Sequence, residues 1–358
     1  MAGPLIALVL AAEQLLSCAT IPAPKMNLSG TSLRASAAGR FRTRLLAWYD
    51  ANARELPWRQ KPGSRKSHDP YRIWLSEIML QQTRVAAVIE HYHEFLRRFP
   101  TVEKLASARE ASVLAAWSGL GYYRRARMLH AAAKQIVRKL RGKFPPTAGA
   151  WQELPGIGRY TAAAIASIAF AEPVAVVDGN VERVLQRFSG KALKPENLWL
   201  AAEGLLDRDR PGDFNQAMME LGATVCTPRC PMCLTCPVVE LCATRGEMKL
   251  APKAEPQRKQ EVHYTLDCRD GSVFLVRRPL DARLMPGMWE LPELFPPADP
   301  RKPRFAVRHS ITVTDYTVQV WSLPAPKSAA GKWVATNKLE RLPLTGLTRK
   351  ILGKARVL

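Results

Sequence analysis

The chain has 358 residues, which is enough for two or three domains with cores of their own. Its 53 Lys and Arg residues exceed its 31 Asp and Glu residues, giving a formal net charge of +22 and a pI near 10.1. The size argues against a small secreted disulfide scaffold, and the charge favours a polyanionic partner. Double-stranded nucleic acid is the first candidate for that partner, ahead of an acidic membrane surface or of no specific polyanion.

Residues 3–16 form an apolar stretch that resembles a weak signal sequence. No Lys or Arg precedes it, an acidic residue interrupts it, and it is too short to span a bilayer. We therefore expect Met26 to be the true start of the protein and residues 1–25 to be an upstream extension. Residues 27–39 are rich in Ser, Ala and Gly, so 1–40 as a whole is expected to be disordered or extraneous to the fold.

Residues 41–250 are predicted to form one helical domain. Apolar residues recur three and four positions apart through five stretches, and prolines and glycines separate these stretches. No internal repeat is evident. The expected helical stretches are 71–99, 103–117, 122–140, 159–170 and 179–188.

After a polar linker at 251–262, the apolar residues alternate with a period of two. We place a domain boundary near residue 255 and expect a small α+β domain over 263–358. The predicted fold is therefore a mostly α domain followed by a small α+β domain. Strand is expected over 272–276 and over the stretch from 311–313 through 318–321.

The first candidate functional residue is a glutamate in the first helical stretch. Glu77 follows Ile73 and Trp74 at four and three residues, which places it on the apolar face of its helix. A buried carboxyl group is costly unless it is paired or protonated, and a raised pKa suits general-acid work near neutral pH. Taken alone, however, Glu77 fits a buried ion pair with an arginine better.

Residues 154–161 read Leu-Pro-Gly-Ile-Gly-Arg-Tyr-Thr and are predicted to be a glycine-rich hairpin between two helices. Such a hairpin leaves backbone N–H groups uncrowded at a helix N-terminus. This geometry binds a phosphate oxygen of DNA without reading the base sequence. An ordinary tight turn between helices is the alternative interpretation.

Asp178 follows a short apolar run and precedes a predicted helix, which suits an N-cap. We expect its carboxylate to stay ionised, because the end of a helix favours an anion. It lies 18 residues beyond Tyr160, so a hairpin that grips DNA is placed to bring it to a nucleotide. An ionised Asp178 and a protonated Glu77 make the asymmetric carboxyl pair that N-glycoside cleavage needs.

Four cysteines follow in the order C-x6-C-x2-C-x5-C, namely Cys226, Cys233, Cys236 and Cys242. Four thiolates on one short segment hold either a [4Fe–4S] cluster or a tetrahedral zinc ion, and ligand count does not separate the two. Cys230 also allows a rival quartet with Cys226, Cys233 and Cys236 that looks more like a zinc site. Disulfide bonds are the weakest interpretation.

Together these motifs resemble the adenine DNA glycosylase (MutY) family of helix-hairpin-helix glycosylases. The match covers nearly all of residues 41–245. The resemblance implies a helix-hairpin-helix glycosylase domain with a [4Fe–4S] cluster at 226–242, leaving Cys230 outside the ligand set. The matching segments are 56–59, 74–83, 119–123, 154–161, 177–181, 214–222 and the four cysteines.

The resemblance also implies a reaction. Such an enzyme flips adenine out of a duplex in which it is mispaired with 8-oxoguanine or guanine, and hydrolyses its N-glycosidic bond. Glu77 would protonate adenine N7, Asp178 would stabilise or trap the sugar cation, and Tyr160 and Asn180 would position these groups. The other implied substrate and DNA contacts are Leu56, Trp58, Arg59, Leu80, Gln82, Thr83, Leu120, Tyr122, Gly156, Gly158 and Glu220.

Three of these contacts have a structural alternative: Trp58 and Tyr122 fit core aromatics, and Glu220 fits a surface charge. Tyr160 separates branches of the superfamily. Relatives of the endonuclease III type carry a lysine at that position, which forms a Schiff base with the sugar and cleaves the strand. A tyrosine cannot do so, and a monofunctional glycosylase is therefore expected.

The C-terminal domain resembles a shortened Nudix-like module at 273–279 and 285–292, but it lacks the acidic metal helix of Nudix hydrolases. The resemblance implies recognition of the damaged base rather than hydrolysis of pyrophosphate. The family's Phe-Ser-His loop corresponds here to 311–313, directly after Ser310. Thr312 keeps a hydroxyl group, whereas the aromatic ring and the imidazole are lost, which puts preference for 8-oxoguanine over guanine in doubt.

Two other functions remain open on the sequence: a mismatch or pyrimidine-damage glycosylase on the same scaffold, and a DNA-binding cluster protein without catalysis. The implied partner is double-stranded DNA containing adenine opposite 8-oxoguanine or guanine. We expect a monomer that does not bind membranes and that works in the cytoplasm, at the nucleoid.

Overall fold

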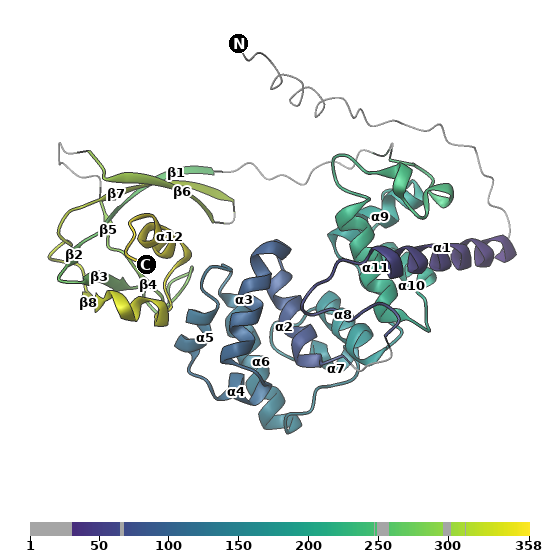
Figure 1. The fold of residues 1–358 in the computed structure, drawn as a ribbon, viewed down its shortest axis with the longest axis horizontal. Helices are drawn as coiled ribbons and strands as arrows, with labels where there is room; N and C mark the ends of the chain where they lie inside the picture. Colours follow the sequence, from purple (N-terminus) through teal and green to yellow (C-terminus); the bar gives the residue numbers. More distant parts are fainter. Residues whose placement is uncertain (1–30, 65–67, 247, 249–257, 296–301, 312) are drawn as a thin grey trace, which may run out of the picture. The chain divides into compact units, whose positions relative to one another are not determined.

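Most helices of the described chain come first, and its strands follow before a last helix (Figure 1). The predicted mostly α domain and small α+β domain are therefore confirmed. By their contacts the residues form two compact units, in which residues 74–145 group with the C-terminal part. The chain passes for the last time from the first unit to the second at residues 252–253, close to the predicted boundary near residue 255. The computed structural model describes residues 31–64, 68–246, 248, 258–295, 302–311 and 313–358, with the backbone alone over 31–36.

The first unit comprises residues up to 73, 146–152 and 158–252. Its elements are α1 (Thr31–Asn52), the start of α2 (Pro70–Leu80), α7 (Ala148–Gln152), α8 (Arg159–Phe170), α9 (Gly179–Ser189), α10 (Pro195–Leu205), α11 (Pro211–Thr224), η1 (Cys233–Thr235) and η2 (Val239–Leu241).

Helix α11 is the centre of this unit, because it packs against α1, α8 and α9. Two glycines of α11 allow this helix to lie close to α8 and α9. A Cβ atom at Gly212 would lie 2.7 Å from the carbonyl oxygen of Ser167 in α8, and one at Gly222 would lie 2.6 Å from Cβ of Asn180 in α9. Any larger side chain at these positions would push α11 away from its neighbours.

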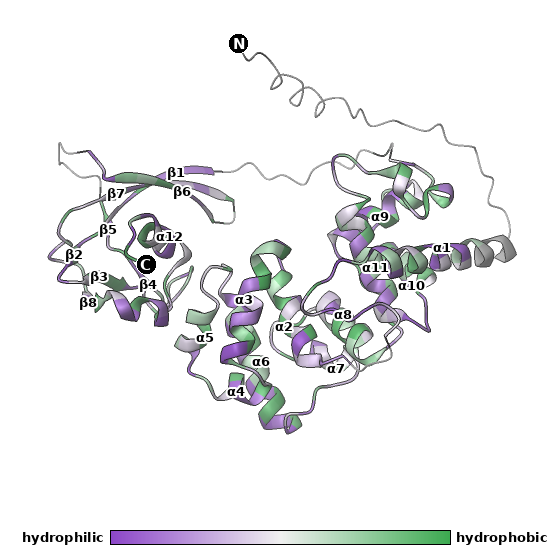
Figure 2. Ribbon diagram, in the orientation of Figure 1, coloured by the Kyte–Doolittle hydropathy of each residue, from purple (hydrophilic) through white to green (hydrophobic). Residues whose placement is uncertain are grey.

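The second unit comprises residues 74–145, 153–157 and 253–358. Its helical part contains the rest of α2 with α3 (Val85–Arg98), α4 (Val102–Ser107), α5 (Glu110–Ala116) and α6 (Arg124–Leu140), and α4 and α5 pack against α6. Hydrophilic and hydrophobic residues alternate along α3 and α6, as burial of one helix face requires (Figure 2).

Two stretches that the sequence predicts as single helices are each broken in two. The stretch 71–99 breaks at 81–84, where Gln82 adopts a left-handed φ of 54° that an α-helix does not contain. The stretch 103–117 breaks at 108–109, where the backbone is extended. The apolar spacing continues across both breaks, so periodicity alone does not reveal them.

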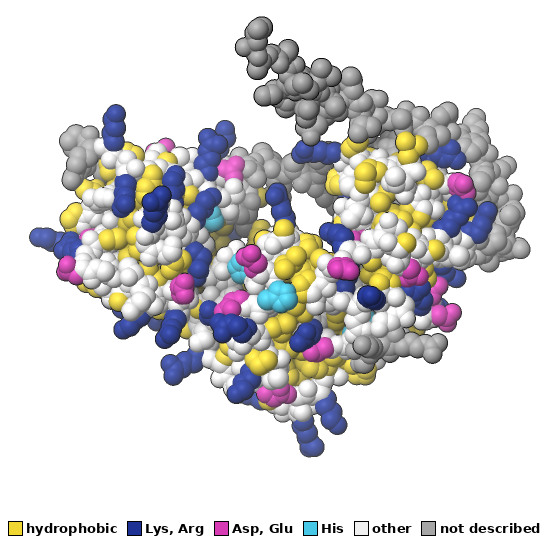
Figure 3. All heavy atoms as spheres, viewed as in Figure 1, with side chains coloured by type: hydrophobic (Ala, Val, Ile, Leu, Met, Phe, Trp, Pro, Cys, Tyr) yellow, Lys and Arg dark blue, Asp and Glu magenta, His cyan; other side chains and the backbone are white. Residues whose placement is uncertain are grey.

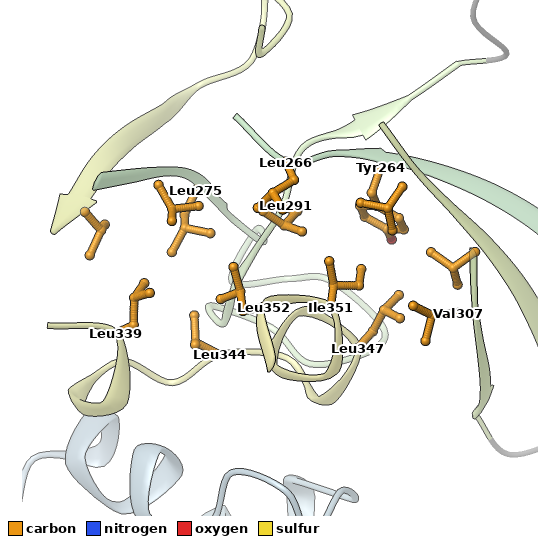
Figure 4. Packing of buried hydrophobic residues seen from close by; sticks show 14 residues of the cluster. Tyr264, Leu266, Leu275, Leu291, Val307, Leu339, Leu344, Leu347, Ile351 and Leu352 are labelled. Carbon is orange, nitrogen blue, oxygen red and sulfur yellow. The ribbon is translucent and has the colours of Figure 1, made fainter. Parts of the chain in front are cut away.

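The C-terminal part of the second unit has two small sheets, with strand orders β5-β1-β7-β6 and β2-β3-β4, and β8 also pairs with β3. Figure 4 shows Leu347, Ile351 and Leu352 of helix α12 packed among Leu275 and Val307, one from each sheet. The elements are β1 (Arg258–Thr265), β2 (Cys268–Arg269), β3 (Ser272–Arg277), β4 (Trp289–Glu290), β5 (Glu293–Leu294), β6 (Phe305–Ile311), β7 (Thr314–Trp321), β8 (Gly331–Ala335), η3 (Thr336–Arg341) and α12 (Gly346–Lys354).

Three expectations about the ends of segments are wrong. Residues 31–40 belong to α1 rather than to a disordered extension, because alanine-rich sequence supports a helix. Residues 258–262 belong to β1 rather than to a linker, since pairing with β7 uses backbone groups that polar residues also have. The expected strand stretch 311–321 is not continuous, because β6 ends at Ile311 and pairs there with Thr314, the first residue of β7 (Thr314–Trp321).

Lys and Arg side chains are more widespread than Asp and Glu side chains on the face that Figure 3 shows, as the net charge predicts. Among the described residues, no helix is both long enough and apolar enough to cross a membrane. The expected start at Met26 and the extension before it lie outside the described residues.

Candidate active site

Asp178 caps the N-terminus of α9, as the sequence predicts. Its Oδ1 accepts hydrogen bonds from the backbone N–H groups of Asn180 at 2.9 Å and Val181 at 2.7 Å, and its Oδ2 accepts one from Nδ2 of Asn180 at 3.0 Å. Burial nevertheless raises the pKa of Asp178, although these bonds and the charge of Arg183 oppose the shift. Desolvation therefore outweighs the groups that favour the anion, and the expectation that the carboxylate stays ionised remains a prediction.

Arg183, which the sequence analysis missed, connects Asn180 to the segment that carries the cysteines. Its Nη2 donates to Oδ1 of Asn180 at 2.8 Å and to the carbonyl oxygen of Gly222 at 2.7 Å. Its Nε donates to the carbonyl oxygen of Cys226 at 2.8 Å. The only sequence signal for this role is the spacing of three residues from Asn180, which places both on one helix face.

Tyr160 lies in the first turn of α8 and is partly buried. Its hydroxyl group is 3.2 Å from Sδ of Met219 in α11. The hairpin before it has a left-handed residue at Gly156, with φ of 77°, and Gly158 is the N-cap of α8 without a side-chain hydrogen bond. This hairpin therefore has the glycine-dependent geometry that the sequence predicts.

Glu220 is a buried acid between two arginines and not the surface charge that the sequence left open; 1% of its surface is exposed. Arg54 donates to it through Nε at 2.5 Å and Nη2 at 2.9 Å, and Arg59 lies 2.9 Å away. Burial raises the pKa of Glu220, but the bonds from Arg54 and the charge of Arg59 outweigh it and leave the pKa lowered. Trp58 is buried in this unit, whereas Leu56 is partly exposed.

Glu77 lies on α2 within the second unit and is 7% exposed, which confirms that its helix face is buried. Leu80 ends the same helix, and Thr83 donates its backbone N–H to the carbonyl oxygen of Leu80 at 3.2 Å. Leu120, which lies two residues before Tyr122 in the sequence, is buried. The structure therefore places Glu77 among the buried polar residues of the second unit.

A cleft of about 1130 Å³ opens within the second unit. Gln82 and Tyr122 line it from the helical segments, and Gly156 lines it from the hairpin. Tyr122 is 47% exposed, so its interpretation as a core aromatic is wrong. Basic, apolar and small residues of the C-terminal part complete the lining: Arg283, Leu284, Met285, Pro286, His309, Ser310, Ile311, Gly346 and Lys350.

One of the residues expected to read the opposite base, Ser310, lines this edge of the cleft. Ser310 is exposed and donates from Oγ to Oδ1 of Asp315 at 2.5 Å. Thr312 lies outside the described residues. His309 is half-buried, and burial together with the charge of Lys350 lowers its pKa, which favours the neutral imidazole in the cleft wall.

Cys226, Cys233, Cys236 and Cys242 line one small cavity of about 30 Å³, whereas Cys230 is exposed and outside it. The lining of this cavity favours the quartet Cys226, Cys233, Cys236 and Cys242 over the rival quartet that includes Cys230. Burial raises the pKa of the Cys236 thiol to about 12, and the charges of the other three cysteines act in the same direction. The described cysteines form no disulfide, and no three His, Cys, Asp or Glu side chains in the described part of the chain are arranged to hold a single metal ion. Thiolates are the ligands of iron–sulfur clusters, so the type of these four residues fits such a group, although their arrangement here is not that of a closed metal site.

A family model for "HhH-GPD superfamily base excision DNA repair protein" matches residues 75–198. The adenine DNA glycosylase of Rattus norvegicus is 38% identical over 80% of this chain, and that of Homo sapiens is 50% identical over 58% of it. The chain spans 65% of the Rattus norvegicus protein and 40% of the Homo sapiens protein.

Two solved structures share the helical fold. A thermostable thymine-DNA glycosylase aligns with a TM-score of 0.54 and 29% identity, covering 60% of this chain and 99% of its own. Endonuclease III in a non-covalent complex with DNA aligns with a TM-score of 0.50 and 19% identity, covering 62% of this chain and 98% of its own. With the site and these similarities in place, residues 75–198 match the HhH-GPD superfamily of base excision DNA repair proteins, and the chain is similar to adenine DNA glycosylases over as much as 80% of its length.

Proposed function

We propose that this chain is a monofunctional adenine DNA glycosylase that hydrolyses the N-glycosidic bond of adenine mispaired with 8-oxoguanine or guanine and so begins base excision repair. The observation that carries the proposal is the carboxyl group of Asp178, fixed by three hydrogen bonds at the start of α9, in a chain similar to adenine DNA glycosylases. A carboxylate held in this way needs no reorganisation when positive charge develops beside it.

The two carboxyl groups have different tasks in this proposal. Glu77, buried on α2, donates a proton to N7 of the flipped adenine, so that the base leaves as a neutral molecule. Asp178 stabilises the sugar cation that forms, or traps it covalently, before water adds. Asn180 fixes the orientation of the Asp178 carboxylate, and Tyr160 occupies the place of the lysine of strand-cleaving relatives.

The adenine pocket is proposed at the buried group around Glu220. Arg54 and Arg59 hold this carboxylate ionised in the first unit, with the Trp58 ring buried close by in sequence. A fixed ionic group can present hydrogen-bond donors and acceptors to the edge of one base and reject others. Leu56 would pack against the same base.

Double-stranded DNA is the proposed partner, bound by a monomer. The hairpin with Gly156 and Gly158 would hold a phosphate through backbone N–H groups, and the basic surface would neutralise others. Gln82 and Tyr122, exposed in the cleft, would enter the base stack with support from Leu80, Thr83 and Leu120. Titration of a labelled mispaired duplex, followed by its sedimentation, measures this stoichiometry.

The C-terminal part, proposed to be Nudix-like, would read the base opposite adenine. Ser310 lies at the cleft, and Thr312 would add a hydroxyl group for the N7 side of 8-oxoguanine. The protein lacks the aromatic and imidazole groups of the family's loop at 311–313. We therefore expect only a modest preference for 8-oxoguanine over guanine, of about tenfold, which is the value of one hydrogen bond.

The four cysteines of the small cavity are proposed to hold a [4Fe–4S] cluster, which would supply structural support for DNA binding. Because metal binding and local folding are coupled, replacing Cys236 by serine is expected to loosen residues 226–242 and to weaken DNA affinity about tenfold or more. The purified protein should show broad absorbance near 400 nm and about four irons per chain. One zinc ion per chain without this absorbance would contradict the assignment.

A single-turnover assay on duplexes with adenine opposite 8-oxoguanine, guanine or thymine tests the main proposal. Half of each sample is treated with alkali, which breaks the strand at abasic sites. We expect breaks at adenine opposite 8-oxoguanine only after alkali, and a loss of at least about a hundredfold in Glu77→Gln. Breaks without alkali would instead assign a strand-cleaving enzyme, and excision of thymine alone would assign a pyrimidine glycosylase, in line with the thymine-DNA glycosylase likeness.

A further inference from the structure

Two exposed residues of the cleft have a backbone conformation that costs energy. Gln82 has φ of 54° and Tyr122 has φ of 47°, both in the left-handed region, where a residue other than glycine costs about 1 kcal/mol or more. Both side chains line the cleft of the second unit. Such strain persists only where neighbouring groups hold the backbone in place.

One guanidinium group holds both backbones. Arg125, at the start of α6, donates to the end of α2 on one side and to the segment before Tyr122 on the other. Its Nη1 bonds to the carbonyl oxygens of Ile78 at 3.0 Å, Met79 at 3.0 Å and Gln81, and its Nη2 bonds to Oγ1 of Thr83 at 3.2 Å and to the carbonyl oxygens of Leu120 at 2.9 Å and Gly121 at 3.3 Å.

The two faces of the Arg125 guanidinium plane also contact aromatic rings. Its central carbon lies 5.4 Å from the centre of the Tyr122 ring and 5.5 Å from that of Trp117. The indole N–H of Trp117 donates to the carbonyl oxygen of Gly121 at 3.2 Å, which closes the loop from behind. Burial lowers the pKa of Arg125 to about 10, so the group stays charged near neutral pH while its donors are turned toward protein carbonyls.

We propose that Arg125 is a positioning residue that presets Gln82 and Tyr122 for entry into the DNA base stack. The proposal rests on the base-flipping function proposed above. Because the left-handed conformations are held in the free protein, the cost of ordering both residues falls on folding and not on DNA binding. A lysine cannot replace Arg125, since one ammonium group has neither the planar fork nor the stacking face.

The test compares Arg125→Lys with the unchanged protein on two substrates. In the first, adenine is paired in a duplex opposite 8-oxoguanine; in the second, it faces an abasic analogue and is already partly unstacked. We expect Arg125→Lys to lower the single-turnover rate about tenfold or more on the first substrate and less than about twofold on the second, since a small misplacement of wedge residues costs up to about a hundredfold. Fluorescence of 2-aminopurine at the target position reports flipping directly and should show the same difference.

Arg97→Lys is the matched control. Arg97 lies on α3 and donates to both carboxylate oxygens of Glu94, and neither residue lines the cleft. We expect this control to change the ratio of the two rates by less than about twofold. In a protein that already carries Gln82→Ala and Tyr122→Ala, Arg125→Lys should have no further effect on the ratio, because it acts through those residues.

The outcomes are separable. Equal losses on both substrates would show that Arg125 only supports the fold and would overturn the proposal. If Arg125→Lys does not fold, Thr83→Val is used instead, because it removes one hydrogen-bond acceptor of Arg125. Thr83→Val should lower the ratio of the rate on the first substrate to the rate on the second, by a smaller factor. An unchanged ratio would also overturn the proposal. Failure of the unchanged protein to excise adenine from either substrate would instead reject the proposed function.

Discussion

At the scale of single residues, two carboxyl groups of the first unit, one buried and one partly buried, have opposite pKa shifts. Glu220 is paired with two arginines, so its pKa is lowered in spite of burial. Asp178 is held by hydrogen bonds, and burial raises its pKa although the charge of Arg183 opposes the shift. Ionised Asp178 therefore lowers the stability of the fold, and it is the group proposed to stabilise the sugar cation. Active-site residues commonly reduce stability in this way in return for activity.

Replacing Asp178 by asparagine is expected to stabilise the fold and to reduce excision at least about a hundredfold. Because the pKa of Asp178 is raised in the folded protein, its contribution to stability is fully present below the ordinary pKa and is lost as the pH rises through the folded value. Asparagine does not titrate and caps a helix equally well. The gain in the free energy of unfolding should therefore grow from pH 4 toward pH 7, measured by urea unfolding.

Asp178→Ala is the control for that experiment, because it also removes the charge but loses the cap, at a cost of about 1 kcal/mol. If Asp178→Asn were less stable than the unchanged protein at pH 7, the hydrogen bonds of the carboxylate would outweigh its burial. The N-cap and the burial of Glu77 are local properties and could be predicted from the sequence. The sign of the Asp178 shift and the contacts of Arg54, Arg125 and Arg183 depend on distant packing, so they could not.

At the scale of elements, glycines decide where helices meet. The sequence predicts the hairpin between α7 and α8 because Gly156 and Gly158 stand at fixed places around a proline. It does not predict the breaks at 81–84 and 108–109, where no glycine interrupts the apolar pattern. Nor does it predict that Gly212 and Gly222 let α11 approach α8 and α9, since a helical glycine has no local signal for its neighbour.

Gly156→Ala should lower the stability of the protein by about 2 kcal/mol. Gly156 has φ of 77°, and a Cβ atom there would lie 2.4 Å from Cβ of Met128, so both strain and a clash arise. Gly158→Ala is the matched change, because nothing lies within 4 Å of a Cβ at Gly158 and its φ of −90° suits any residue. The thermal unfolding midpoints should fall for the first variant and stay within a few degrees for the second. Equal midpoints would mean that the hairpin relaxes without cost.

At the scale of the whole molecule, composition predicts the partner better than it predicts the division of the chain. The charge excess and the helical and strand-forming parts can be read from the sequence. The grouping of 74–145 with the C-terminal residues cannot, because it arises from contacts between residues far apart in sequence. Tyr123 illustrates this: its hydroxyl donates to the carbonyl oxygen of Leu344 at 2.9 Å, and Arg349 donates to Ser118 at 2.8 Å.

DNA affinity is expected to fall steeply with salt. Each phosphate neutralised by a Lys or Arg releases a counterion, so raising monovalent salt from 50 to 200 mM should weaken binding of a non-cleavable mispaired duplex at least about tenfold. Fluorescence anisotropy over this range gives the slope, and hence the number of phosphates in contact. A slope near zero would mean that the charge of +22 serves another partner.

The packing of α1 against α11 also determines when the protein can fold during its synthesis. Helix α1 ends at Asn52, but α11 starts at Pro211, so the ribosome must add about 160 residues before the two can meet. At ordinary elongation rates this takes on the order of 10 s. For that time the apolar face of α1, including Phe41 and Leu45, has no native partner on α11. The nascent chain is therefore expected to depend on chaperones during this interval, before the cysteine segment that follows α11 has been made.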